Sequence, residues 1–103
     1  MKLDMQNIIM NLILNAGDAK SDCILAIQDA RKKNFCHARK LLEEADQKIL
    51  KIHKLQNDLM QQECRGEKIE VSMMMIHAQD HLTNALVTFD LANEFVSYIE
   101  ENG

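Results

Sequence analysis

Residues 72–99 read SMMMIHAQDHLTNALVTFDLANEFVSYI, and this stretch decides the fold. Apolar side chains recur in it every three or four positions, which is the repeat of an α-helix. One stripe comprises Met75, Ala78, Leu82, Ala85, Phe89, Ala92, Val96 and Ile99, and a second comprises Met73, Ile76, Asp80, Thr83, Val87 and Leu91. Since a single stripe is enough to pack a helix against its own chain, the second stripe predicts that further copies of the chain cover this helix.

Two earlier segments show the same period. Their stripes are Met5, Ile9, Leu12, Ala16, Ala19, Cys23, Ala26 and Ala30 in the first segment, and Ala38, Leu42, Ala45, Ile49, Ile52 and Leu59 in the second. Gly17 falls inside the first segment, where glycine costs about 1 kcal/mol relative to alanine. We expect it to permit the close approach of a neighbouring helix, or a slight bend. Gly66 is expected to end the second helix, and Ser72 to cap the third.

The composition supports an all-α domain. Proline is absent and glycine occurs only at 17, 66 and 103, too few for a fold rich in turns. The sequence therefore predicts a single domain over residues 1–103, an antiparallel three-helix bundle with helices at approximately 4–31, 35–64 and 71–101. A net charge of −4 argues against nucleic acid as a partner. No apolar run approaches the ~20 residues of a membrane span and no signal peptide is evident, so we expect a cytoplasmic protein without direct membrane insertion.

The three cysteines are odd in number and lack the spacing of metal ligands. We interpret them as reduced thiols, with Cys23 in the core because it lies on the apolar stripe of its helix.

His77, Asp80 and His81 form the candidate functional cluster. They occupy positions i, i+3 and i+4, so a helix projects them as neighbours. Three interpretations stay open from the residues alone. His77 could carry a phosphoryl group, with Gln79 and His81 as hydrogen-bond donors. His77 and His81 could bind zinc with a third ligand from His53 or from a carboxylate of another helix. The cluster could also serve only to fix the register of an oligomeric bundle.

Asp80 lies in the second stripe of the third helix, among apolar residues. If copies of this helix meet at a symmetry axis, several carboxylates gather there. Such a group must take up protons or bind a cation. A hard divalent ion such as Mg²⁺, which prefers oxygen ligands, would satisfy it.

The segment from Met75 to Leu82, followed by Asn84 and Ala85, resembles the active-site signature of the lactose/cellobiose-specific enzyme IIA components of the bacterial sugar phosphotransferase system. The resemblance covers nearly the whole chain. It includes the small-residue element at 16–20, the histidine and glutamine at His53 and Gln56, and the loop at 66–68.

The resemblance implies a homotrimer, a nine-helix bundle in which the Asp80 residues of three chains share one Mg²⁺. It implies that His77 accepts a phosphoryl group from the phosphocarrier protein HPr and passes it to a cysteine of the sugar-specific IIB component. Gln79 and His81 are implied to orient the phosphoryl group, with an adjacent subunit as one source of His81. The implied activity is that of a phosphotransferase component with a phosphohistidine intermediate.

Two positions depart from the family pattern. Thr83 stands where methionine is common, and the turn at 32–35 lacks an expected glycine. Ala78 favours the cellobiose and oligo-β-glucoside branch over the lactose branch. The alternatives that we retain are a histidine phosphotransfer domain of two-component signalling and a non-enzymatic helical protein that binds metal or acts as a scaffold.

Overall fold

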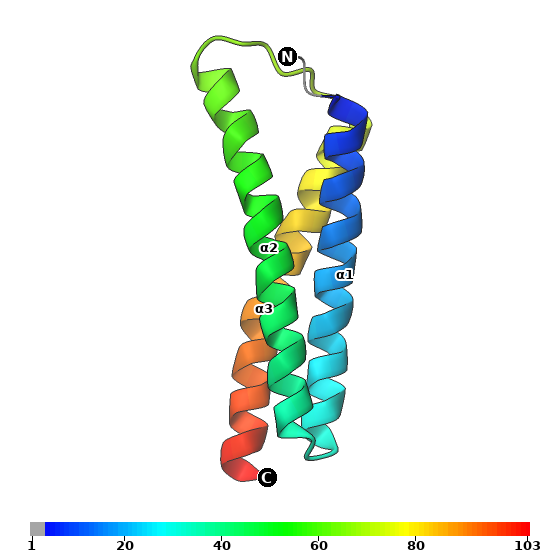
Figure 1. The fold of residues 1–103 in the computed structure, drawn as a ribbon, viewed down its shortest axis with the longest axis vertical. Helices are drawn as coiled ribbons and strands as arrows, with labels where there is room; N and C mark the ends of the chain where they lie inside the picture. Colours follow the sequence, from blue (N-terminus) through cyan, green and yellow to red (C-terminus); the bar gives the residue numbers. More distant parts are fainter. Residues whose placement is uncertain (1–3) are drawn as a thin grey trace.

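The computed structural model describes residues 4–103, which form three long helices. They are α1 (Met5–Arg31), α2 (Phe35–Cys64) and α3 (Met73–Asn102). The helices run antiparallel in sequence order, so α1 and α3 point the same way (Figure 1). The bundle measures 52 × 21 × 20 Å. The predicted all-α antiparallel three-helix bundle is confirmed. Within residues 4–103, none of the helices has the length and apolarity that a bilayer crossing requires.

The core is built from the predicted stripes. Its largest fully buried side chains are Leu12, Cys23, Ile52, Leu82 and Val96, and every helix contributes at least one of them. Buried alanines fill much of the remaining stripe on α1. Small side chains let helices approach closely, so this slender molecule excludes water from its axis without bulky residues. The core position predicted for Cys23 is confirmed.

The helix ends follow local chemistry. The side chain of Asp4 accepts a hydrogen bond from the Gln6 amide, and that of Ser72 accepts one from the Met75 amide at 3.1 Å. Because Asp4 and Ser72 are caps with extended backbone, α1 begins one residue, and α3 two residues, later than predicted. Gly66 ends α2 with φ +87°, as expected. In the first turn Lys33 adopts φ +67° in place of the missing glycine.

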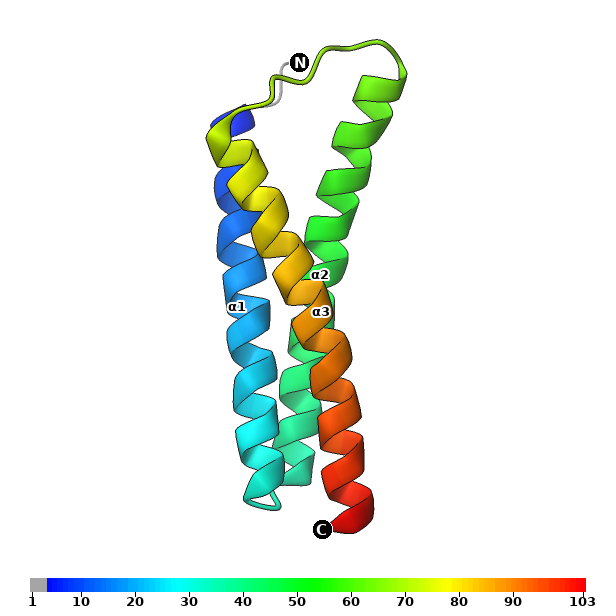
Figure 2. The same ribbon diagram turned by 180° about the vertical axis from the view of Figure 1, so that it is seen from behind.

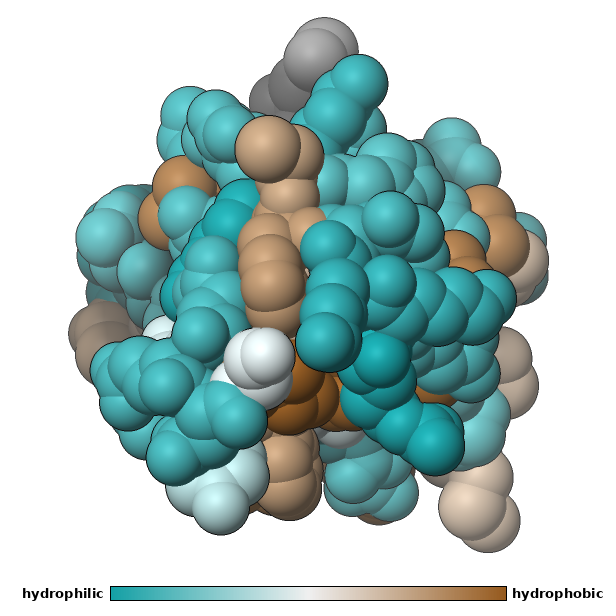
Figure 3. All heavy atoms as spheres, turned by 90° about the horizontal axis from the view of Figure 1, so that it is seen from below, coloured by the Kyte–Doolittle hydropathy of each residue, from teal (hydrophilic) through white to brown (hydrophobic). Residues whose placement is uncertain are grey.

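Ion pairs link α2 to α1. Lys48 donates a 2.6 Å hydrogen bond to Asp22 of α1, and this bond raises the pKa of Lys48. His37 pairs with Asp29 near the first turn. The two ion pairs identify the flank of α1 that faces α2. At the end of the bundle that carries this first turn, the surface is mainly hydrophilic, with apolar side chains showing between the polar ones (Figure 3).

α2 diverges from the other two helices toward its C-terminal end, while the N-terminal halves of α1 and α3 stay side by side (Figures 1 and 2). The segment 65–72 crosses the widened end of the bundle. The divergence leaves a pocket of about 270 Å³ between α2 and α3.

Large apolar side chains stay exposed mainly on two of the three helices. Within residues 4–103, α3 carries seven of them (Met73, Met74, Ile76, Val87, Leu91, Phe95 and Tyr98), α1 four (Met10, Leu14, Ile24 and Leu25) and α2 only two (Leu50 and Met60). The second stripe of α3 therefore faces outward, as predicted. The close approach of a neighbouring helix expected at Gly17 is not made by any of residues 4–103, because a Cβ atom there would meet nothing within 4 Å.

Candidate functional site

His77 and His81 form a direct pair on the second and third turns of α3. Their Nε2 atoms lie 3.0 Å apart, and the rings meet edge to face with centroids 4.4 Å apart. His77 is exposed and His81 is half-buried. Since one hydrogen bridges the two nitrogens, one ring donates from Nε2 while the other accepts with a bare Nε2 lone pair. The pair can thus present a nucleophilic nitrogen with a donor beside it.

The local sequence places this pair near the positive end of a helix. The Ser72 cap fixes where α3 begins, so His77 is the fifth residue of the helix. The unpaired amides and the dipole of a helix N-terminus favour negative charge nearby. A phosphoryl group attached to His77 would therefore lie in a favourable field.

Asp80 does not join the histidine pair. Its side chain is exposed, and no hydrogen bond or ion pair links it to another residue of the described chain. It lies on the outward face of α3, with Ile76 four positions before it and Val87 seven positions after it, both more than half exposed. Of the three residues that were expected to be neighbours, only His77 and His81 therefore meet within one chain.

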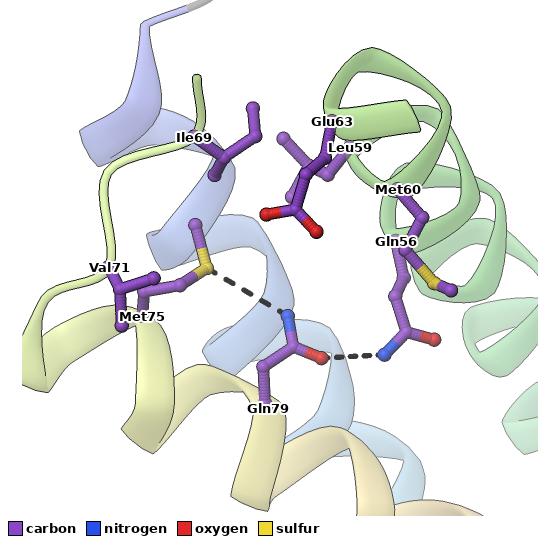
Figure 4. Close-up of a pocket in the computed structure, with 8 residues that line it drawn as sticks. All are labelled: Gln56, Leu59, Met60, Glu63, Ile69, Val71, Met75 and Gln79. Atoms are coloured by element: carbon purple, nitrogen blue, oxygen red, sulfur yellow. Dashed lines mark hydrogen bonds between the residues drawn. The ribbon is translucent and has the colours of Figure 1, made fainter. Parts of the chain in front are cut away.

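Gln79 lies on the opposite flank of α3. Its Oε1 accepts a 2.6 Å hydrogen bond from Nε2 of Gln56 on α2, and its own Nε2 lies 3.8 Å from the sulfur of Met75 (Figure 4). Positions i and i+2 do not share a helix face. Gln79 consequently lines the α2–α3 pocket and does not reach His77 of its own chain.

We call this pocket the α2–α3 groove. Its lining includes Gln56, Leu59, Met60, Ile69, Met75 and Gln79. Figure 4 shows the Glu63 carboxylate directed into the space between the two helices. The sequence offered Gln56 only as a match to a family position; its bond to Gln79 depends on the α2–α3 register, which periodicity does not reveal.

The zinc interpretation lacks a third ligand in one chain. Among residues 4–103, no three His, Cys, Asp or Glu side chains gather closely enough to hold a metal ion. His53 is exposed on α2, and among residues 4–103 no hydrogen bond joins it to the histidine pair. Any metal held through Asp80 would need carboxylates from other copies, whose oxygens suit a hard cation.

Comparison with known proteins decides between the remaining interpretations. Residues 7–100 match the family described as PTS system, Lactose/Cellobiose specific IIA subunit. This chain belongs to that family. The resemblance inferred from the sequence is thus confirmed, and a family of sugar phosphotransferase components replaces the signalling and scaffold alternatives.

Individual relatives cover nearly the whole chain. The lichenan-specific phosphotransferase enzyme IIA component of Bacillus subtilis (strain 168) is 39% identical over 101 residues, which is 98% of this chain and 92% of the relative. The crystal structure of the PTS cellobiose-specific enzyme IIA from Bacillus anthracis has a TM-score of 0.91 and 39% identity, covering 98% of this chain and 93% of that one. A IIA(chitobiose)–HPr complex of the Escherichia coli phosphotransferase system matches with a TM-score of 0.83 and 25% identity, covering 97% of both chains.

As a member of this IIA family, the protein is a phosphotransferase component of sugar uptake. The exposed ring of His77 is consistent with membership of this family, because phosphoryl transfer needs an accessible nucleophile.

Proposed function

We propose that His77 is the phosphoryl carrier of this IIA component. It takes the group from HPr and passes it to a cysteine of the IIB component, in the cytoplasm, during uptake of cellobiose or related β-glucosides. The observation that carries the proposal is the His77–His81 contact, which joins an exposed imidazole to a hydrogen-bond donor. A related IIA protein in complex with HPr supports the choice of donor.

The chemistry is a pair of displacements. When His81 donates from Nε2, Nε2 of His77 carries no proton, and its lone pair attacks the donor's phosphorus as the His81 hydrogen bond to it opens. An N–P bond forms on His77 as the N–P bond of the donor histidine breaks. His81 then turns its donor hydrogen toward a phosphoryl oxygen. In the second displacement the IIB thiolate attacks, an S–P bond forms, and His77 recovers its lone pair.

Three copies of the chain are proposed to meet along the outward face of α3. Asp80 supports this arrangement, because its exposed carboxylate, which pairs with no other side chain of residues 4–103, stands on a mostly apolar face. Three such carboxylates at one axis would hold a Mg²⁺ ion, one per trimer. The bound ion would neutralise charge that otherwise opposes assembly.

Gln79 is proposed to act on a neighbouring copy. It lies on the flank of α3 that faces α2, whereas His81 is within hydrogen-bond distance of His77 in its own chain. In a ring of copies around α3, these two flanks of adjacent chains come together. We therefore propose His81 from the same chain and Gln79 from the next as the groups that orient the phosphoryl group.

Intact mass spectrometry tests the carrier. With phosphoenolpyruvate, enzyme I and HPr, the wild-type chain should gain the mass of one phosphoryl group, which acid removes, and His77→Ala should gain none. His81→Ala should slow the transfer by roughly 10- to 150-fold, the worth of one hydrogen bond to a charged group. His81→Gln, which keeps a donor, should recover part of the rate. A wild-type chain that stays unmodified, or an adduct on His77→Ala, would refute the proposal.

A further inference from the structure

A single amide–amide hydrogen bond crosses the α2–α3 groove. Nε2 of Gln56 on α2 donates to Oε1 of Gln79 on α3 over 2.6 Å, and both side chains are half-buried (Figure 4). Apart from Glu63, the other described residues that line the groove are apolar. Polar groups lose hydration in such surroundings, and two apolar side chains of similar size would pack there at comparable or lower cost. Packing alone therefore does not explain this pair.

The bond fixes which way the amide of Gln79 points. An amide has one accepting oxygen and one donating nitrogen. Because Gln56 occupies the oxygen, Gln79 turns Nε2 away from Gln56, and this nitrogen lies 3.8 Å from the sulfur of Met75. The Glu63 carboxylate is directed into the same groove (Figure 4). The sulfur and the carboxylate are both acceptors, so they too favour a nitrogen rather than an oxygen on this side of Gln79.

This orientation matters for the proposed reaction. A phosphoryl group presents negatively charged oxygens that accept hydrogen bonds, so only the nitrogen of an amide can bind it. Nε2 of Gln79 carries two hydrogens, and the Met75 sulfur is a weak acceptor for one of them. The other is available to a phosphoryl group on a neighbouring copy. With the amide turned over, Oε1 would face that group and repel it.

We infer that Gln56 is a positioning residue for phosphoryl transfer. It holds Oε1 of Gln79 and thereby presents Nε2 to the phosphoryl group, which Gln56 itself does not touch. Without Gln56, the Gln79 amide would have to be ordered during each transfer, at a cost in rate of roughly 2- to 12-fold for one long side chain. This inference rests on the proposed role of Gln79 and names the residue that acts behind it.

Two substitutions at position 56 test the direction of the bond. Gln56→Met removes the donor and should slow transfer from phosphorylated HPr by roughly 2- to 12-fold. Gln56→Glu at neutral pH can only accept, so it should bind Nε2 of Gln79 and turn the amide over. Transfer should then slow by roughly 10- to 150-fold, at least as much as in Gln79→Ala, because a hydrogen bond to a charged group is lost. Single-turnover rates measured by rapid quenching give these values.

A double-mutant cycle separates positioning from a structural role. In a Gln79→Ala background, Gln56→Met and Gln56→Glu should cause no further loss, because the amide through which they act is absent. Gln61→Glu is the matched control: Gln61 is exposed on the same helix five positions away, outside the groove lining, and this variant should keep the wild-type rate. Circular dichroism and sedimentation equilibrium check that each variant folds and assembles like the wild type.

The outcomes separate this inference from the proposed function. If Gln79→Ala transfers at the wild-type rate, the proposed role of Gln79 is wrong and this inference falls with it, while phosphorylation of His77 still stands. If Gln79→Ala is slow but both Gln56 variants match the wild type, the positioning inference alone is wrong. A loss in Gln56→Glu that persists in the Gln79→Ala background would belong to the added charge, and would equally overturn it.

Discussion

At the scale of single residues, reactivity depends on what surrounds each side chain. His77 is exposed, so a partner protein can reach its ring, and a second imidazole lies within hydrogen-bond distance of its Nε2. Cys23 is also a nucleophile by type, but it is fully buried between the helices. Burial disfavours the thiolate and, with Asp22 beside it, raises the pKa of Cys23 to about 11.

The thiols provide a direct test of this difference. Cys36 and Cys64 are exposed, whereas Cys23 is not. With a thiol reagent at neutral pH, the folded protein should react quickly at two cysteines and the unfolded protein at three, because only a solvated thiolate attacks. A Cys23→Ala variant should keep both fast thiols. Fast reaction of all three in the folded chain would contradict the core position.

At the scale of elements, the start of α3 determines where the histidine pair lies. The Ser72 hydroxyl satisfies the Met75 amide, and the helix proceeds from there through His77 and His81. Without this bond the first turn loses one of its few partners for open amides. The cap therefore connects a single hydroxyl to the geometry of the site.

Ser72→Ala should lower the free energy of unfolding by about 1 kcal/mol, the usual worth of an N-cap. Urea denaturation followed by circular dichroism measures it. Ser72→Asp should retain most of the stability, because a carboxylate also accepts from the amide and suits the helix dipole. A loss in Ser72→Asp equal to that in Ser72→Ala would show that the cap contributes little.

At the scale of the whole molecule, the exposed apolar side chains are unevenly distributed over the three helices. Among residues 4–103, most of the exposed large apolar side chains belong to α3 and α1, and few belong to α2. Exposed apolar faces of this extent are typical of protein interfaces. Asp80 places a charge on this face of α3, so assembly should depend on whether a cation or a proton neutralises that charge.

Asp80→Leu should remove divalent-ion binding and stabilise the metal-free trimer by about 1–4 kcal/mol, because an apolar side chain replaces gathered carboxylates. Elemental analysis and sedimentation equilibrium without added metal measure the two effects. Asp58→Leu, at an exposed position on α2, serves as the control and should change neither. One ion per trimer in Asp80→Leu would contradict an axial site.

Local periodicity alone determined much of this protein. Helical spacing predicted the core stripes, the cap at Ser72 and the meeting of His77 with His81, because contacts at i and i+4 depend only on the helix itself. The outward direction of Asp80 followed from the same spacing.

Only the tertiary structure decided how the helices lie against one another. The divergence of α2 opens the α2–α3 groove, whose lining comes from both helices. The hydrogen bond between Gln56 and Gln79 joins two positions that are 23 residues apart in the sequence. The open space beside Gly17 likewise depends on where the other described helices lie. Crossing angles and register arise from side chains packing between helices, and a repeat along one helix carries no information about where the next one crosses it.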